Sequence, residues 1–403
     1  MVQEGKPIAL PPYERSKDDP MTIAIESGFH SLVEVLLENG FSPNGDALYD
    51  AISPLNRDLV DLLLAYGADV RPIDFEDVVE TNNKELIQLF IDMGADIETG
   101  YSLVDGFMRA PRLFCGVYKN NIDKFPNLKT QAEIALRQFC EKDRMQGICL
   151  MLWLGADPRS KIPYDEEEDD PEFWDSALSI AIRMGNLEVV KKMKPNAEQD
   201  DLSELLRIAC RSRDLDLIRY FIKRGAEPSW IGPDGECALR SAFWNLGWAA
   251  DRSLYFARSE TEIRKAKECL FELVRRGARW EPKDKHDFST ARKVFYVLDW
   301  PQIVEVLKVL QEHSVFPEEV LVKIFNTPKM RRELAPHVKD LSSMIPWFAR
   351  WLPKTPKKKS AGLGSKRKRG AVSSAGIPIG KTPKPKQHPQ LRDNPHLVQR
   401  LDP

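Results

Sequence analysis

A short phrase recurs along this chain: two large apolar residues, two or three further residues, then Gly-Ala-Asp or a close variant. Self-similarity at a fixed period is typical of repeat proteins, in which each unit contacts its neighbours. The glycines of the phrase are Gly40, Gly67, Gly94, Gly155, Gly225 and Gly277. The first three of them lie 27 residues apart, a register that chance would not hold. Any fold proposed for the chain must therefore account for this repeat.

Two apolar patterns at helical spacing precede each glycine. In the first copy, Met21, Ala24 and Ile25 form one short face, and apolar residues within 32–37 form a second. Gly28 lies between the two faces, where the chain must turn tightly. The glycine that closes each copy suits the left-handed conformation that commonly ends a helix. A helix pair with one apolar stripe per helix can bury the stripes only by stacking, so we predict an all-α helical-repeat solenoid.

The repeats resemble those of the ankyrin-repeat family. Residues 19–28 are similar to the opening pattern T-P-L-H-x-A-x-x-x-G, and Leu-Leu-x-x-Gly-Ala-Asp is similar to its close. Related openings begin at Ala47, Ala177 and Ala238. The resemblance covers six or seven copies and one eroded copy near residues 295–314. The histidine of T-P-L-H is absent from every copy, and a 27-residue period is shorter than the roughly 33 residues of an ankyrin repeat, so we expect trimmed loops between the helix pairs.

The resulting domain prediction divides the chain into four parts: a flexible N-terminal arm over 1–19, ankyrin-like repeats over 20–300 with insertions near 100–130, 160–173 and 246–265, capping helices over 301–352, and a disordered basic tail over 353–403. The segment 100–129 has no repeat pattern, which leaves an eroded repeat and an inserted loop as alternatives. The block 165–172 has seven carboxylates in eight residues, and its self-repulsion predicts a solvated loop.

The charge of the chain is divided between an acidic body and a basic tail. Residues 351–403 contain 13 Lys and Arg but only two acids, a net charge of +11, whereas the preceding residues have a net charge of −13. The tail has two basic clusters, Lys357-Lys358-Lys359 and Lys366-Arg367-Lys368-Arg369. Such clusters bind phosphate groups through counterion release or form a nuclear import signal. A solubilising tail without a partner is the alternative.

The sequence contains no recognisable catalytic or metal-binding pattern. Its six histidines are scattered, and its six cysteines form no C-x-x-C pair or disulfide framework, which favours a reduced intracellular chain. Residues 376–382 resemble a phosphate-binding loop but are one residue short, and prolines prevent the helix that should follow. No apolar stretch approaches the roughly 20 residues needed to cross a bilayer. We therefore predict a protein that is not an enzyme, with no cofactor, metal or membrane partner.

The resemblance to ankyrin repeats implies a partner surface on a concave face built from the first helix of each repeat. The exposed positions implied there are Glu26, Ser27, Asp50, Ser53, Asp77, Glu80, Thr81, Gln138, Glu141, Lys142, Arg183, Met184, Arg211, Ser212, Ser241, Trp244 and Asn245. Along this order the charge changes from acidic in the first three copies to basic in the fifth and sixth. Trp244 is the best anchor candidate, with packing between repeats as its alternative role.

We therefore predict a scaffold or adaptor that binds another protein through the groove, with the basic tail contacting nucleic acid or an import carrier. The alternative function is a regulator or nucleic-acid-associated factor whose activity lies in the tail and is inhibited by the acidic body. The predicted location is intracellular, nuclear if the host is a eukaryote and otherwise cytoplasmic.

Overall fold

The computed structural model describes residues 19–44, 46–52, 55–162, 175–251 and 259–337. Several predicted features lie outside these residues: the acidic block 165–172, Ser53, the end of the predicted capping segment and the basic tail. Two units are distinguished along the chain, residues 1–351 and 352–403, and every described helix belongs to the first.

Almost every helix belongs to a pair, and the pairs follow one another along the chain. The first helices are α1 (Pro20–Glu26), α3 (Asp46–Ile52), α5 (Phe75–Glu80), α7 (Ser102–Arg109), α9 (Asn127–Glu141), α11 (Ala177–Arg183), α13 (Leu202–Ala209), α15 (Ala238–Ala249), α17 (Lys285–Val297) and α19 (Glu318–Phe325). The second helices are α2 (His30–Glu38), α4 (Arg57–Ala65), α6 (Lys84–Asp92), α8 (Pro111–Asn121), α10 (Met145–Trp153), α12 (Leu187–Met193), α14 (Leu215–Lys223), α16 (Glu260–Arg275), α18 (Trp300–Glu312) and α20 (Pro328–Leu334).

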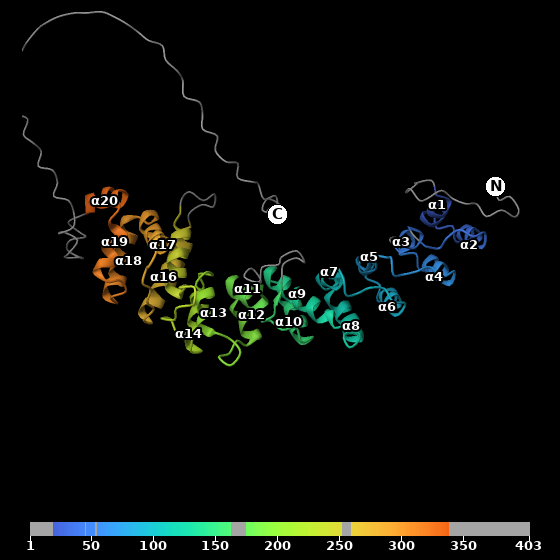
Figure 1. Cartoon of the computed structure of the whole chain (residues 1–403), viewed down its shortest axis with the longest axis horizontal. Coiled ribbons are helices and arrows are strands. Elements are labelled where there is room, and N and C mark those ends of the chain that lie inside the picture. Colours follow the sequence, from blue (N-terminus) through green and yellow to red (C-terminus); the bar gives the residue numbers. More distant parts are fainter. Residues whose placement is uncertain (1–18, 45, 53–54, 163–174, 252–258, 338–403) are drawn as a thin grey trace, which may run out of the picture. The chain divides into compact units, whose positions relative to one another are not determined.

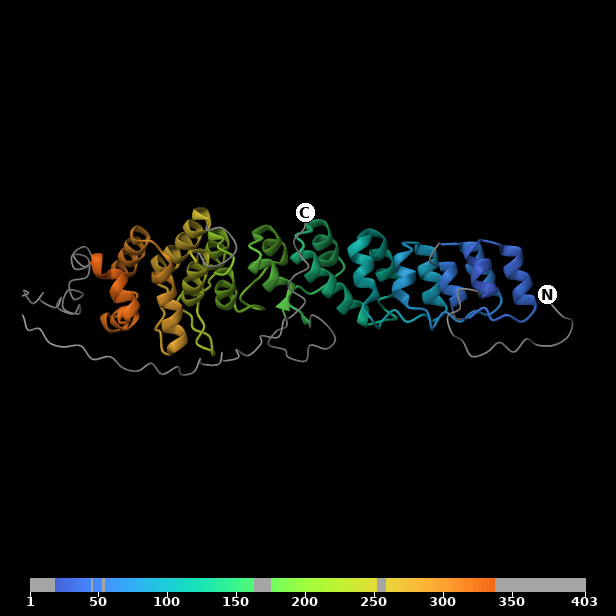
Figure 2. The same ribbon diagram turned by 90° about the horizontal axis from the view of Figure 1, so that it is seen from above.

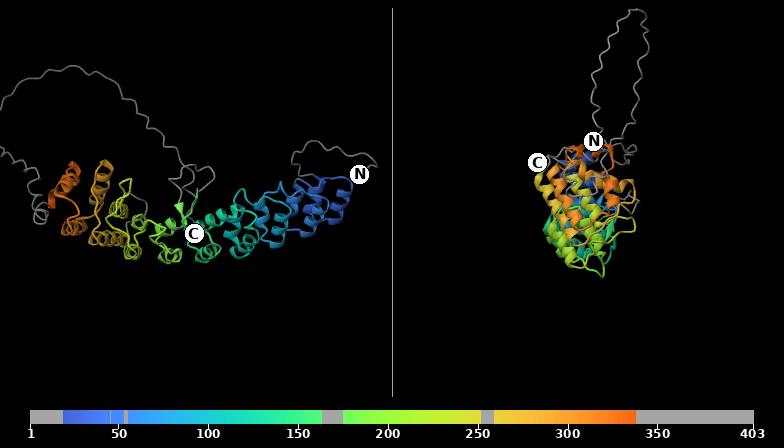
Figure 3. Two further views of the ribbon diagram at one scale, coloured as in Figure 1. Left: turned by 60° about the horizontal axis from the view of Figure 1, so that its bottom comes forward. Right: turned by 90° about the vertical axis from the view of Figure 1, so that its left-hand side faces the viewer.

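The helices form two rows. Each first helix packs against the next first helix at every step from α1 to α19, and we call this set the first-helix row. The second helices pack against one another at most steps, for example α6 on α8 and α14 on α16. From α1 to α12, Figure 1 shows each first helix above its partner, and Figures 2 and 3 show the successive pairs side by side. The predicted all-α helical-repeat fold is confirmed.

The turn inside each pair has the same backbone geometry in most repeats. One residue takes a positive φ there. It is a glycine in the first pair (Gly28) but not in the second and third pairs (Leu55 and Asn82). Where the next residue is asparagine, its side chain caps the second helix: Asn56 accepts a hydrogen bond from the backbone N–H of Leu59 at 3.3 Å, whereas Phe29 after Gly28 makes no side-chain cap. Asparagine is well suited to this cap because its short side chain reaches the free N–H groups of the first turn. The closing glycines of the six copies have φ between 85° and 104°, the conformation predicted for them.

The segment 100–129, which has no repeat pattern, contains a complete helix pair. Helix α7 packs between α5 and α9, and α8 packs between α6 and α10, so the pair continues both rows. Its core consists of large side chains such as Phe107 and Phe114, which are fully buried. Gly106 allows Phe114 to approach, because a Cβ on this glycine would lie 2.6 Å from the ring. The segment therefore has the structure of a repeat although its sequence lacks the repeat pattern.

The rows continue beyond the last closing glycine. Helix α18 packs on α16 in the second row, and α19 packs on α17 in the first. Strands are nearly absent from the described residues: β1 (Lys161–Ile162) pairs antiparallel with β2 (Asp175–Ser176), on either side of the acidic block. A short 3-10 turn, Ala335–His337, follows α20. In the described part of the chain, no helix combines the length and apolar character needed to span a membrane.

Candidate protein-binding surface

The first-helix row positions nearly all the residues that the sequence nominated for partner binding. Those that the structure describes lie on the first helices or in the turn directly after them. Glu26, Ser27, Glu80, Lys142, Arg183, Met184, Arg211 and Trp244 are exposed, and Asp50, Asp77, Thr81, Gln138, Glu141 and Ser212 are half-buried. This common placement follows from the repeat, because equivalent positions of stacked pairs fall on one side of the stack.

Two of the nominated residues are buried instead. Ser241 is 4% exposed and Asn245 is 3% exposed, so these two positions are not the exposed ones that the resemblance implied. Asn245 donates hydrogen bonds to the carbonyl oxygens of Cys210 at 2.8 Å and Arg211 at 3.0 Å. Its own carbonyl oxygen accepts one from Arg213 Nε at 2.8 Å. Asn245 therefore ties α15 to the end of α13.

Two nominated hydroxyls serve the turns between helices. Thr81 Oγ1 donates to the carbonyl of Val78 at 2.7 Å and accepts from the backbone N–H of Asn83. Ser212 Oγ donates to the carbonyl of Ala209 at 2.8 Å in the equivalent place. Because these hydroxyls are engaged within the chain, the charged and aromatic members of the set offer more for binding.

The acidic end of the surface lies on α5 and its neighbours. A hollow of about 140 Å³ is lined by Tyr49, Asp77, Glu80 and Thr81. Burial, reinforced by the nearby carboxylates of Asp74 and Glu80, raises the pKa of Asp77. Glu80 is also paired with Arg109 of α7. The negative charge at this end is therefore partly offset within the protein.

Glu76 and Asp105 form a carboxyl pair between α5 and α7. The hydrogen bond that protonated Glu76 donates to Asp105, together with burial and repulsion, raises the pKa of Glu76 above its ordinary value. The folded protein therefore binds this proton more tightly than the unfolded chain does. Above the raised pKa of Glu76, the folded state bears the repulsion between the two carboxylates and the unfolded chain does not.

Replacing Glu76 by glutamine should stabilise the protein at pH 7 by about 0.5 kcal/mol, a modest gain because solvent screens the pair. The gain should shrink as the pH falls through the raised pKa of Glu76 and be absent below its ordinary value, since the carboxyl is then neutral in both states. Urea unfolding at pH 7 and pH 4 measures the difference. Glu34→Gln on exposed α2 is the control, and an equal gain at both pH values would contradict the assignment.

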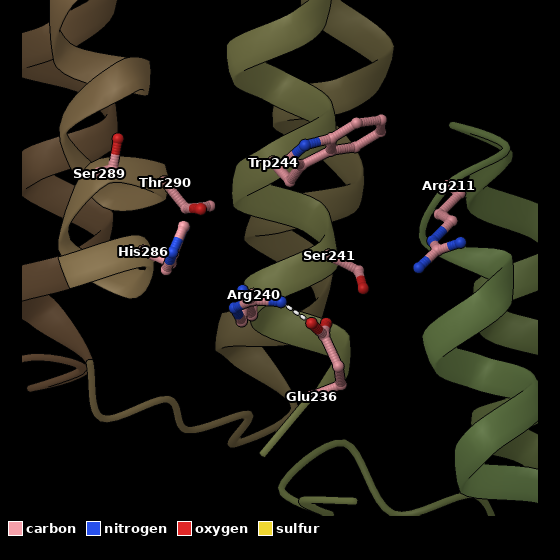
Figure 4. A pocket seen from close by; sticks show the side chains of 8 residues that line it. All are labelled: Arg211, Glu236, Arg240, Ser241, Trp244, His286, Ser289 and Thr290. Atoms are coloured by element: carbon pink, nitrogen blue, oxygen red, sulfur yellow. Dashed lines mark ion pairs between the residues drawn. The ribbon is translucent and has the colours of Figure 1, made fainter. Parts of the chain in front are cut away.

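The other end of the surface contains a larger cavity. It has a volume of about 420 Å³ and is lined by Arg211, Glu236, Arg240, Ser241, Trp244, His286, Ser289 and Thr290. These residues come from the turn after α13, from α15 and the short segment before it, and from α17 (Figure 4). Sequence reasoning missed the contribution of α17, because this helix has lost the opening pattern. The spacing of His286, Ser289, Thr290 and Lys293 on one helical face was the available signal.

An exposed aromatic pair borders the cavity. Trp244 is 47% exposed and Trp248 is 41% exposed, with their ring centroids 5.7 Å apart. Lys293 of α17 lies beside this pair, with its Nζ 5.7 Å from the Trp248 ring centroid and an ion pair to Asp251. Gly247 makes room for Lys293, because a Cβ there would lie 3.3 Å from its Cγ. Trp244 thus leaves about half of its surface open beside the cavity.

A second hollow, of about 470 Å³, lies at the turns that follow α11 and α13. Met184, Ser212 and Arg213 contribute to its lining, together with Lys265 of α16. Arg183, directly before Met184, is paired with Asp175 of β2 at 2.8 Å. The basic charge expected in the fifth copy is therefore balanced locally, which leaves Arg211 as the more prominent positive group.

Most cysteines are buried, and potential metal ligands do not cluster in the described part of the chain. All cysteines are free and only Cys149 is exposed. Burial raises the pKa of Cys140 and of Cys269 to about 12, so these thiols stay protonated. Among the described residues, no group of three or more His, Cys, Asp or Glu could hold a metal ion.

Comparison with known proteins gives neighbours among solved structures only. No protein-family model matches the chain, and no curated protein matches it. The chain is similar to the human ASB11 ankyrin repeat domain, with 13% identity and a TM-score of 0.26 over 64% of this chain and 98% of that domain. It is also similar to the ankyrin repeat domain of Bcl-3, with 16% identity and a TM-score of 0.28 over 73% of this chain and 100% of that one. Both are ankyrin repeat domains, the family that the repeated phrase resembles. A likeness at this level does not name a partner.

Proposed function

We propose that this protein is a non-enzymatic scaffold that binds another protein through the first-helix row. The observation that supports this function is the exposed pair of Trp244 and Trp248 beside a polar cavity. Large aromatic side chains leave water favourably and contribute far more than their share to protein interfaces. Two of them on one face, next to hydrogen-bonding groups, form the combination of apolar centre and polar rim that interfaces use.

Another exposed tryptophan gives a useful contrast. Trp153 is 63% exposed at the end of α10, in the second row, and Lys119 Nζ lies 3.2 Å from its ring centroid. The lysine of the same molecule therefore already covers one face of this ring. The proposal assigns partner binding to Trp244 and Trp248 and assigns none to Trp153.

Trp244→Ala should weaken binding of a partner by about 30-fold, or about 2 kcal/mol, because it removes the aromatic anchor. Proteins captured by the whole chain should be compared with those captured by the Trp244→Ala and Trp153→Ala variants. The dissociation constant of one captured partner is then measured by titration calorimetry. We expect Trp153→Ala to retain the partner. Equal affinity for the wild type and both variants would contradict the proposed surface.

The proposal also assigns the basic clusters 357–359 and 366–369 to contact with nucleic acid or an import carrier. Its support is the sequence alone, through the net charge of +11 in residues 351–403. The alternative function, with activity in the tail and inhibition by the acidic body, predicts a different result in the same experiment. If the alternative holds, a variant with both clusters changed to glutamine should lose all captured partners. The Trp244→Ala variant should then keep them.

A further inference from the structure

The cavity between α13, α15 and α17 contains charged groups of two kinds. Arg240 is already neutralised, because it forms an ion pair with Glu236 and a second one with Asp287 at 2.8 Å. Figure 4 shows the Arg240–Glu236 pair at the base of α15. Glu236 and Asp287 are thus both engaged with Arg240, and they balance its charge.

Arg211 is different. Its side chain is exposed after α13, and within the described part of the chain its guanidinium makes no hydrogen bond or ion pair. The neighbouring arginines do have partners: Arg207 binds Glu204, and Arg183 binds Asp175. Although the residue is exposed overall, partial burial of its guanidinium, followed by repulsion from Arg207 and Arg183, lowers the pKa of Arg211. The folded protein therefore holds a positive charge here that an anion would stabilise.

The position of Arg211 is determined by the buried side chain of the next repeat. Asn245 holds the backbone carbonyls of Cys210 and Arg211 at 2.8 and 3.0 Å. The backbone of Arg211 is thus attached to α15, the helix that presents Trp244. Figure 4 shows the Arg211 and Trp244 side chains both projecting into the space between α13 and α15. A ligand can therefore meet the cation of Arg211 and an aromatic surface together.

The remaining groups around the cavity are neutral hydrogen-bonding groups. His286, Ser289 and Thr290 of α17 line it, and none of their side chains has a hydrogen-bond partner among the described residues. Hydroxyl and imidazole groups can donate to carboxylate or peptide carbonyl oxygens. They can also accept from peptide N–H groups, so they suit an extended polypeptide backbone.

We infer that this cavity binds an extended acidic segment of the partner protein, with an Asp or Glu carboxylate on Arg211 and an adjacent apolar side chain on Trp244 and Trp248. The inference rests on the proposed function and adds the chemistry of the partner. A carboxylate matches the planar, two-pronged donor geometry of a guanidinium. A nucleic-acid backbone does not fit, because it needs a broad positive surface, and Glu236 and Asp287 balance the other cation of this cavity.

The experiment selects peptides on the whole chain from a random 12-residue display library. We expect the selected peptides to contain Asp or Glu next to a large apolar residue. One of them is synthesised in two forms, with its acids retained or changed to the corresponding amides. Their dissociation constants are measured by fluorescence anisotropy for the wild type, Arg211→Gln and Arg211→Lys. Arg275→Gln, at an exposed arginine of α16 in the second row, is the matched control.

Arg211→Gln should weaken binding of the acidic peptide by about tenfold, since a charge-assisted hydrogen bond is lost. Arg211→Lys should bind with intermediate affinity, because the charge remains but the two-pronged geometry does not. The amide peptide should bind about tenfold more weakly to the wild type but show little further loss with Arg211→Gln. That non-additivity shows that the two groups meet.

Several results would overturn the inference. These are selected peptides without acids, a library that yields no binder, or an acidic peptide that binds Arg211→Gln as tightly as it binds the wild type. A phosphorylated form binding more than about tenfold tighter than the carboxylate form would also overturn it, because the site would then recognise phosphate. Peptides that lack acids yet lose binding with Trp244→Ala would leave the proposed function standing and remove only this inference.

Discussion

Phe139→Ala should lower the free energy of unfolding by about 3–5 kcal/mol, the cost of removing a buried phenyl ring and leaving a cavity. Phe139 lies on α9 and is 1% exposed. Its ring packs directly over Gly147 of α10: a Cβ on this glycine would lie 2.3 Å from Cδ1 of the ring. The Phe139 ring and Gly147 thus form a close contact between α9 and α10. Few other side chains can fill the volume that the ring would leave.

A double-mutant cycle tests this contact. Gly147→Ala alone should destabilise the protein by about 1–3 kcal/mol, because the new methyl group collides with a buried ring that cannot shift. In the Phe139→Ala background the same change should be neutral or stabilising, since alanine favours the helix and the obstacle is gone. Urea unfolding followed by circular dichroism measures each variant. Phe29→Ala, at a ring that is 59% exposed, is the control with a small expected effect. Additive losses in the double variant would contradict the proposed contact.

Asn245→Ala should lower the free energy of unfolding by about 2–4 kcal/mol, because it removes hydrogen bonds from three buried or half-buried groups at once. The carbonyl oxygens of Cys210 and Arg211 and the Nε of Arg213 all bind this side chain. Arg213 would keep its ion pair with Glu262 at 3.0 Å, so the loss falls mainly on the two carbonyls. Asn245→Ala should also weaken peptide binding, since the backbone of Arg211 loses its attachment to α15.

Asn245→Asp separates the hydrogen bonds that Asn245 donates from the one that it accepts. The carboxylate can still accept from Arg213, but it cannot donate to the carbonyls of Cys210 and Arg211. We expect a loss of stability at pH 7 comparable to that of the alanine variant. Urea unfolding measures both, with Asn120→Ala on the exposed face of α8 as the control. A stability equal to that of the wild type in Asn245→Asp would show that the donated bonds are unimportant.

The sequence was sufficient to predict the helix pairs and their stacking. The closing glycines and the apolar spacing of residues such as Met21 and Leu37 are local signals. A residue in the left-handed conformation commonly ends a helix, and an amphipathic helix needs an apolar stripe, in whichever fold the helix occurs. The same signals failed for α7, α8 and α17. In these helices the pattern has been lost, while contacts with the neighbouring pairs maintain the structure.

Which residues of a first helix face a partner was decided by the tertiary structure. Trp244 and Asn245 are neighbours in sequence and were both nominated, yet one is 47% exposed and the other 3%. A first helix is covered by the preceding and following first helices and by its own partner helix, so only a narrow strip of its surface stays open. The periodicity of apolar residues in the sequence is enough to locate the buried stripe of each helix, because apolar residues at helical spacing share one face. The open strip and the pairing of each charge depend on neighbouring repeats, and only the assembled stack determines them.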